Sequence, residues 1–75
     1  MIDLVKVCPG EYESPEGDEQ LSINKDEGIY ENEYGLFNFE IMRDLDGNFH
    51  HIHWDITPTK FEELEDIIIQ EIKEG

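Results

Sequence analysis

A β-hairpin centred on Asp46-Gly47 is the feature that most constrains the fold of this chain. Asp-Gly favours the positive φ angles of a two-residue type I′ turn, and pairing Leu45 with Asn48 then fixes the register of both strands. In that register one face carries the apolar pairs Phe37–Ile56, Phe39–Trp54 and Ile41–Ile52, and the other carries Asn38–Asp55, Glu40–His53 and Met42–His51. A one-residue shift would mix the two sets. The turn and the alternation therefore predict the same hairpin over residues 36–56.

A C-terminal helix is predicted to follow over residues 58–74. Thr57-Pro58-Thr59 supplies a cap and a proline near the first turn, and Thr59 with Glu62 fits a capping box. One broad apolar stripe recurs at helical spacing, formed by Phe61, Leu64, Ile67, Ile68 and Ile72. Glu65 and Glu71 interrupt the stripe, so we expect its margins to be open to water.

The first half of the chain gives weaker local signals. Ile2, Leu4, Val5 and Val7 predict an N-terminal strand, whereas residues 11–20 are acidic, contain proline and glycine, and predict a loop. Leu21 and Ile23 fit a strand, followed by a turn around residues 25–28 and a short strand near Ile29-Tyr30. The fold expected for residues 1–75 is a single small α+β domain of two layers. In it, an antiparallel sheet of four to five strands is packed by one C-terminal helix.

The charge balance is the strongest statement about function. The 75 residues include 20 Asp and Glu against 5 Lys and Arg, a formal net charge of −15, yet 37% are hydrophobic, which favours a folded chain over a disordered one. A net charge of magnitude about 2–8 already keeps a small domain soluble. The excess therefore calls for another explanation. If Glu31 and Glu33 lie in one strand, they share a face about 6.6 Å apart, which is within a factor of about two of the charge spacing of a nucleic-acid strand.

Such a surface repels nucleic acid and attracts proteins that have basic nucleic-acid-binding channels. The predicted partner is therefore a basic protein, most plainly a nucleic-acid-binding enzyme. The predicted contact residues are the acids of residues 11–34 and of the helix, with two tyrosines among them: Glu11, Glu13, Glu16, Asp18, Glu19, Asp26, Glu27, Tyr30, Glu31, Glu33, Tyr34, Glu62, Glu63 and Asp66. Tyr30 and Tyr34 fit two roles equally, as interface anchors or as rings that cover the edge of the core.

Two patterns suggest metal ions without predicting a site. His51 and His53 share a strand face with Glu40, a donor set that zinc accepts, but neighbouring side chains on a strand diverge and nothing encloses them. Asp44, Asp46 and Asn48 alternate as in a calcium loop, but Phe49 occupies the position that requires glycine. We expect no metal and no cofactor.

Catalysis and membrane insertion are also not expected. Cys8 is the only cysteine, so the chain forms no internal disulfide, and no serine or cysteine has the neighbours of an activated nucleophile. The longest apolar run is Ile67-Ile68-Ile69, far shorter than the roughly 20 residues that span a bilayer. These features predict a non-enzymatic protein of the cytoplasm.

Four functions are considered for this chain. The favoured one is a small acidic inhibitor, encoded by a phage or mobile element, that binds the basic groove of a host nuclease or defence protein by nucleic-acid mimicry. In size and charge only, the chain resembles the small anionic proteins that block restriction enzymes, CRISPR nucleases or repair glycosylases. The first alternative is an immunity protein or antitoxin against a basic nuclease. The second is an adaptor that binds a protein through its exposed sheet face, around Met42, Phe49, His51 and His53. The third is a metal-responsive module that uses the histidines.

Overall fold

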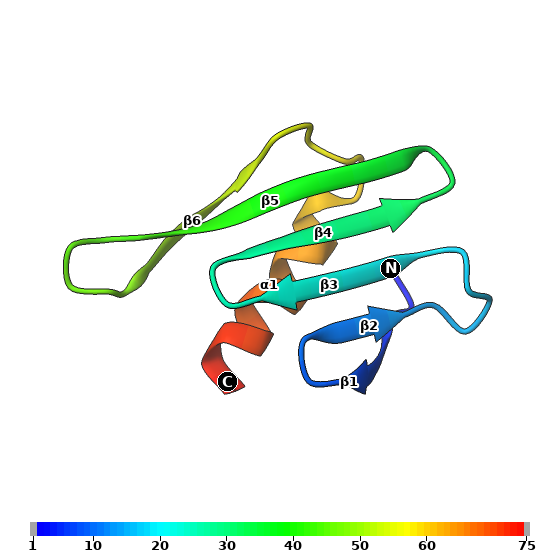
Figure 1. The fold of residues 1–75 in the computed structure, drawn as a ribbon, viewed down its shortest axis with the longest axis horizontal. Coiled ribbons are helices and arrows are strands. Elements are labelled where there is room, and N and C mark those ends of the chain that lie inside the picture. Colours follow the sequence, from blue (N-terminus) through cyan, green and yellow to red (C-terminus); the bar gives the residue numbers. More distant parts are fainter. Residues whose placement is uncertain (1, 75) are drawn as a thin grey trace.

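A computed structural model describes residues 2–74 as one antiparallel sheet of six strands and a single helix (Figure 1). Each strand pairs with its neighbour in sequence, in the order β1-β2-β3-β4-β5-β6. The strands are β1 Val5–Cys8, β2 Glu11–Glu13, β3 Gln20–Asn24, β4 Glu27–Asn32, β5 Gly35–Arg43 and β6 Phe49–Trp54, and the helix is α1 Phe61–Glu74. The expected α+β class is confirmed, with more strands than the four or five predicted.

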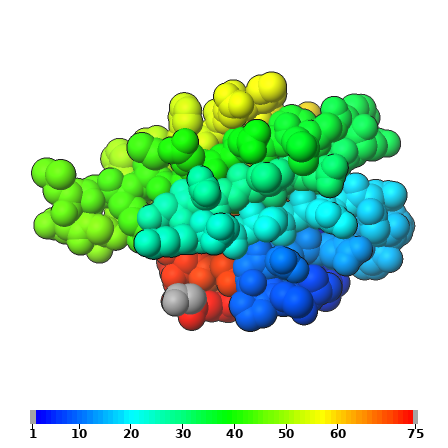
Figure 2. Space-filling view, in the orientation of Figure 1, coloured from blue at the N-terminus to red at the C-terminus, as the bar shows by residue number. Residues whose placement is uncertain are grey.

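The core lies between α1 and one face of the sheet. Leu64 and Ile68 on the helix are completely buried, and residues of four strands pack against them: Leu21, Tyr30, Phe39, Ile41, Ile52 and Trp54. The view in Figure 1 looks onto the opposite face, with α1 behind the sheet. The space-filling view shows that no other part of the chain covers this opposite face (Figure 2). The α1 helix is too short and too polar to cross a membrane, and residues 2–74 contain no other helix.

The register of the predicted hairpin is confirmed at its centre. Phe39 pairs with Trp54, Glu40 with His53, Ile41 with Ile52 and Met42 with His51.

The predicted two-residue turn of this hairpin is wrong. The Asp44 amide donates to the Asn48 carbonyl, the Gly47 amide donates to the Asp44 carbonyl, and Gly47 has a φ of 84°. This is the three-residue loop in which glycine takes the left-handed position. Arg43 then pairs with Phe49, whereas Met42 pairs with His51, so β6 has one extra residue between these two pairs. This β-bulge restores the register that the alternation of apolar and polar residues predicts.

The end of the hairpin and the start of the helix also differ from the prediction. β6 ends at Trp54 and Ile56 is 63% exposed, so the expected Phe37–Ile56 pair does not form. The Asp55 amide still donates to the Asn38 carbonyl, but the chain then turns at Pro58, which is buried and has no amide hydrogen with which to continue a ladder. The helix begins at Phe61 and not at residue 58.

The prediction of a loop over residues 11–20 is only partly correct. Glu11–Glu13 form the short strand β2, whose Tyr12 faces the helix, and only the residues after it form a loop. A three-residue strand with one apolar side chain is too short to show an alternating pattern. Glu31 and Glu33 also do not share one strand, the arrangement considered for them from the sequence. β4 ends at Asn32, so Glu33 lies outside the strand that contains Glu31.

Candidate protein-binding surface

The face of the sheet that α1 leaves uncovered carries all five acids of the described strands. Successive side chains of a strand point to opposite faces. One residue of each strand from β2 to β6 marks the side that faces the core: Tyr12, Leu21, Tyr30, Phe39 and Trp54. The residues directly before and after each of these on its own strand therefore face away from the core. We call this side the outer face. Its six carboxylates come from β2, β4, β5 and the residue after β6, and they are Glu11, Glu13, Glu27, Glu31, Glu40 and Asp55.

Among residues 2–74, none of these six carboxylates makes an ion pair or a side-chain hydrogen bond. The strand residues of the outer face also include no lysine or arginine, since Lys6 and Arg43 have the opposite orientation and pair elsewhere. Glu27 and Glu40 are directly opposite each other on neighbouring strands, an arrangement of like charges that destabilises a sheet. The outer face is thus a negatively charged surface whose carboxylates make no side-chain contact within residues 2–74 that stabilises the fold.

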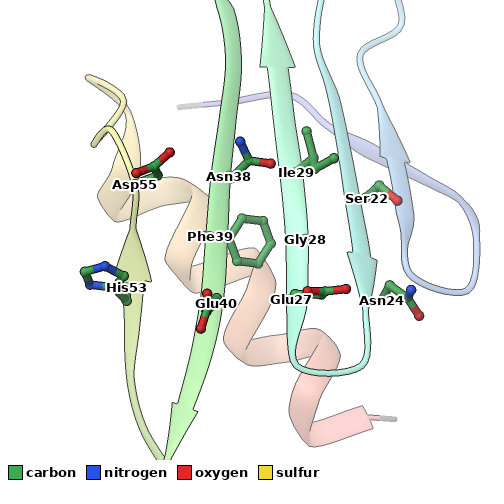
Figure 3. Close-up of a pocket in the computed structure, with 10 residues that line it drawn as sticks. All are labelled: Ser22, Asn24, Glu27, Gly28, Ile29, Asn38, Phe39, Glu40, His53 and Asp55. Atoms are coloured by element: carbon green, nitrogen blue, oxygen red, sulfur yellow. The ribbon is translucent and has the colours of Figure 1, made fainter.

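A shallow concavity of about 650 Å³ lies in the middle of the outer face (Figure 3). Gly28 and Phe39 contribute to its floor, and Glu27, Glu40 and Asp55 are among the side chains around it. Gly28 is required there, because a Cβ atom would overlap the Phe39 ring and the carbonyl oxygen of Ser22. Ile29 lies between the acids and is 42% exposed, so the surface offers apolar as well as charged contacts.

A second concavity of about 680 Å³ lies at one end of the molecule, between the β2–β3 loop, the β4–β5 turn and the segment before α1. Among its lining residues are six of the predicted contacts, Glu16, Asp18, Glu19, Tyr30, Glu33 and Tyr34, with Lys60 as the one cation.

The two tyrosines of this end have different roles. Tyr30 is 1% exposed and its hydroxyl donates to Glu19, so it belongs to the core and not to a contact surface. Burial, together with that hydrogen bond, raises the pKa of Tyr30 to about 12. Tyr34 is 84% exposed and remains available to a partner.

The remaining predicted contacts lie elsewhere. Asp26 forms an ion pair with Arg43, with 2.9 Å between Oδ1 and Nε. Glu62 and Asp66 are exposed on α1, and Glu63 on the same helix is half-buried. Since the sheet separates α1 from the outer face, a single partner surface cannot lie flat against both sets of acids (Figure 1).

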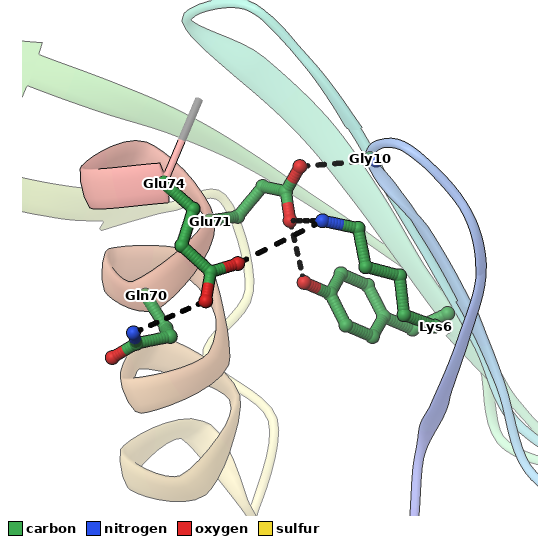
Figure 4. Close-up of polar contacts among 6 residues, drawn as sticks. Lys6, Gly10, Gln70, Glu71 and Glu74 are labelled. Carbon is green, nitrogen blue, oxygen red and sulfur yellow. Dashed lines mark hydrogen bonds and ion pairs between the residues drawn. The ribbon is translucent and has the colours of Figure 1, made fainter.

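Glu71 organises a polar cluster that the sequence did not predict (Figure 4). Its carboxylate accepts hydrogen bonds from the Tyr12 hydroxyl at 2.6 Å and the Gly10 amide at 3.1 Å, and it lies 2.8 Å from the Lys6 ammonium. The bond from Lys6, followed by that from Tyr12, lowers the pKa of Glu71 below its usual 4.5, and burial raises the pKa of Tyr12. This cluster fastens α1 to the β1–β2 hairpin and is structural.

The possible metal ligands are not assembled into a site. Within the described part of the chain, no three His, Cys, Asp or Glu side chains are placed so that they could hold a metal ion. Glu40 is opposite His53, but His51 is opposite Met42. In the calcium-like segment, Asp44 Oδ1 accepts the amide hydrogens of Asp46 and Asn48, both at 2.9 Å, and so serves the turn.

Comparison with known proteins found no matching family model, no similar curated protein and no similar solved structure.

Proposed function

We propose that this protein is a small acidic inhibitor, encoded by a phage or mobile element, that acts in the cytoplasm. It binds the basic nucleic-acid-binding groove of a host nuclease or defence protein by nucleic-acid mimicry, and it is not itself an enzyme. The observation that carries the proposal is the outer face, where six carboxylates have no partner within the described chain and no lysine or arginine intervenes on the strands.

Electrostatics support this function over a merely solvated surface. Like charges on neighbouring strands cost stability, and the total of −15 adds repulsion across the whole molecule. A basic partner would relieve both, and it would also be steered toward the acidic surface at a rate that falls with ionic strength. Exposed Ile29 and Leu36 on the same face would add dehydrated contact area once a partner is docked.

The test is an inhibition assay with purified enzymes. The panel contains a restriction endonuclease, a guide-loaded CRISPR nuclease and a repair glycosylase, each assayed on its DNA substrate with increasing amounts of the protein. We expect inhibition of at least one enzyme, competition with its DNA, and an affinity that weakens steeply between low and high salt. Binding that does not compete with DNA, binding that is insensitive to salt, or no inhibition of the panel would contradict the proposal.

An immunity protein or antitoxin against a basic nuclease is distinguished in the same assay. A purified nuclease toxin is added to the panel as one further enzyme. Inhibition of the toxin alone would replace the favoured function with this alternative.

A second candidate function rests on the end of the β5–β6 hairpin, which extends past the other strands (Figure 1). Leu45 at its tip is fully exposed, and Met42 and Phe49 are 39% and 36% exposed. Exposed apolar side chains on a projecting hairpin favour an adaptor that inserts them into a partner. The adaptor function predicts that binding to the partner protein is lost in Leu45→Ser and in Phe49→Ser. It also predicts that binding of the unchanged protein persists at high salt.

A further inference from the structure

On the outer face, acidic residues on β2 and β4 lie on either side of uncharged residues on β3, an arrangement that a net charge of −15 does not by itself require. The β2 acidic row consists of Glu11 and Glu13, and the β4 acidic row consists of Glu27 and Glu31. Between them the outward residues of β3 are all polar and uncharged, and we call Gln20, Ser22 and Asn24 the β3 polar row. The pairs Glu11–Ser22, Glu13–Gln20, Gln20–Glu31 and Asn24–Glu27 fix this alignment.

We propose that these three rows copy one groove of a nucleic-acid duplex. The proposal rests on the proposed function and specifies the partner: a protein that grips double-stranded rather than single-stranded nucleic acid. The two acidic rows correspond to the two phosphate backbones, and the β3 polar row corresponds to the base edges between them.

The spacing of the strands supports this correspondence. Neighbouring strands lie about 4.8 Å apart, so β2 and β4, with β3 between them, are separated by about 10 Å. That separation is close to the width of the major groove, about 12 Å, and exceeds that of the minor groove, about 6 Å. A partner that places lysines and arginines on both sides of a DNA groove can therefore meet both rows at once.

The β3 polar row matches the chemistry of a groove floor. Amide and hydroxyl groups both donate and accept hydrogen bonds, as the base edges in a groove do. Side chains of the partner that normally reach toward bases would thus find neutral hydrogen-bonding groups and not a third line of charge. The concavity of about 650 Å³ begins at this row, since Ser22 and Asn24 are among its lining residues.

The absence of stacking groups distinguishes a duplex from a single strand. Proteins that bind single strands hold the bases on aromatic platforms, which contribute about 1–3 kcal/mol per base. A mimic of a single strand would need flat rings to offer to those platforms. On β2, β3 and β4, the residues of the outer face include no Phe, Tyr or Trp, because Tyr12 and Tyr30 both face the core.

The experiment uses three charge-reversal variants of the whole chain that each change the net charge equally. Glu11→Lys with Glu13→Lys reverses the β2 acidic row, and Glu27→Lys with Glu31→Lys reverses the β4 acidic row. Glu62→Lys with Asp66→Lys is the matched control on the exposed side of α1. Circular dichroism and Trp54 fluorescence check the fold, and the corresponding Glu→Gln variants replace any row variant that does not fold.

Inhibition is measured on the enzyme panel and on a nuclease specific for single-stranded DNA. We expect the protein to inhibit a duplex-acting enzyme, each row variant to lose about tenfold or more in affinity, and the α1 variant to stay within about threefold. An equal loss in the α1 variant, a loss in only one of the two row variants, or inhibition of the single-strand nuclease alone would overturn the duplex-groove assignment while the inhibitor function stands. No inhibition of any enzyme would overturn both.

Discussion

At the scale of single residues, Glu71 shows how this chain uses an acid inside its structure. In the sequence it interrupts the apolar stripe of the helix and suggests a margin open to water. In the structure its side chain is 13% exposed and binds the Tyr12 hydroxyl, the Gly10 amide and Lys6, which come from the opposite end of the chain. These contacts have sequence separations of about sixty residues, so no local pattern could have revealed them.

Glu71→Gln should lower the free energy of unfolding by about 1–2 kcal/mol at neutral pH, because the bonds to the charged carboxylate are weakened. The folded-state pKa of Glu71 is below its usual 4.5, so its contribution is present above that value and is lost as the pH falls through the folded pKa. The difference between wild type and variant should therefore shrink in acid. Chemical denaturation at several pH values measures it.

Glu74→Gln is the control for this measurement, because Glu74 is exposed and lies 3.8 Å from the same Lys6 ammonium. It should change the stability much less. An equal effect of the two variants, or a difference for Glu71→Gln that grows in acid, would contradict the role assigned to Glu71.

Gly28 is the residue on which the centre of the sheet depends. Gly28→Ala should destabilise the protein by about 1–3 kcal/mol, since the methyl group would overlap the Phe39 ring and the Ser22 carbonyl. The melting temperature followed by Trp54 fluorescence reports the change, because Trp54 packs on Phe39 with ring centroids 5.0 Å apart. In Phe39→Leu the cost of Gly28→Ala should become smaller. An unchanged melting temperature in Gly28→Ala would show that the site has room.

At the scale of elements, the β5–β6 hairpin shows that the alternation of apolar and polar residues determines the strand register, whereas the turn residues determine the length of the loop. The pairing of Phe39 with Trp54 and of Ile41 with Ile52 follows from burial of one face, and the sequence predicted it. The loop has one residue more than predicted, and a compensating irregularity on β6 keeps the same pairs. Asp-Gly predicts a turn, but the three-residue loop also involves the Asp44 carboxylate, which accepts hydrogen bonds from the Asp46 and Asn48 amides.

Asp44→Ala should loosen the tip of this hairpin and cost about 1 kcal/mol of stability, because two backbone amides lose their acceptor. Hydrogen exchange at the amides of Asp46 and Asn48 should become faster, while exchange in the core strands changes little. Asp46→Ala removes the same charge from the same turn and serves as the control. Equal exchange rates in the two variants would show that the carboxylate of Asp44 does not order the turn.

At the scale of the whole molecule, the fold divides the acids between structural and unpaired roles. Glu19, Asp26, Asp44, Glu65 and Glu71 each accept a hydrogen bond within the protein. The six acids of the outer face do not, so six of the twenty acids lie together where nothing in the described chain compensates their charge. This division makes the surface charge costly for the isolated protein and favourable for a complex.

Salt should stabilise the isolated protein, because screening weakens the repulsion among unpaired acids more than the few ion pairs. Raising sodium chloride from low to high concentration should increase the melting temperature by about 5 °C, which for a chain of this size corresponds to about 1 kcal/mol. Trp54 fluorescence or calorimetry measures it. A melting temperature that falls with salt would mean that ion pairs outweigh the repulsion.

The sequence by itself determined the sign of the surface, the α+β class, the central register of the hairpin and the buried stripe of the helix. These depend on composition and on periods of two and 3.6 residues, which are local properties. Only the tertiary structure decided that Glu11, Glu13, Glu27 and Glu31 share one face, that the acids of α1 lie across the sheet from them, and that Tyr30 is buried while Tyr34 is exposed. The physical reason is twofold. β2 is too short to show an alternating pattern, although it pairs with its neighbour in sequence, and the side of the sheet taken by the helix is fixed by contacts between segments about sixty residues apart, which no local pattern contains.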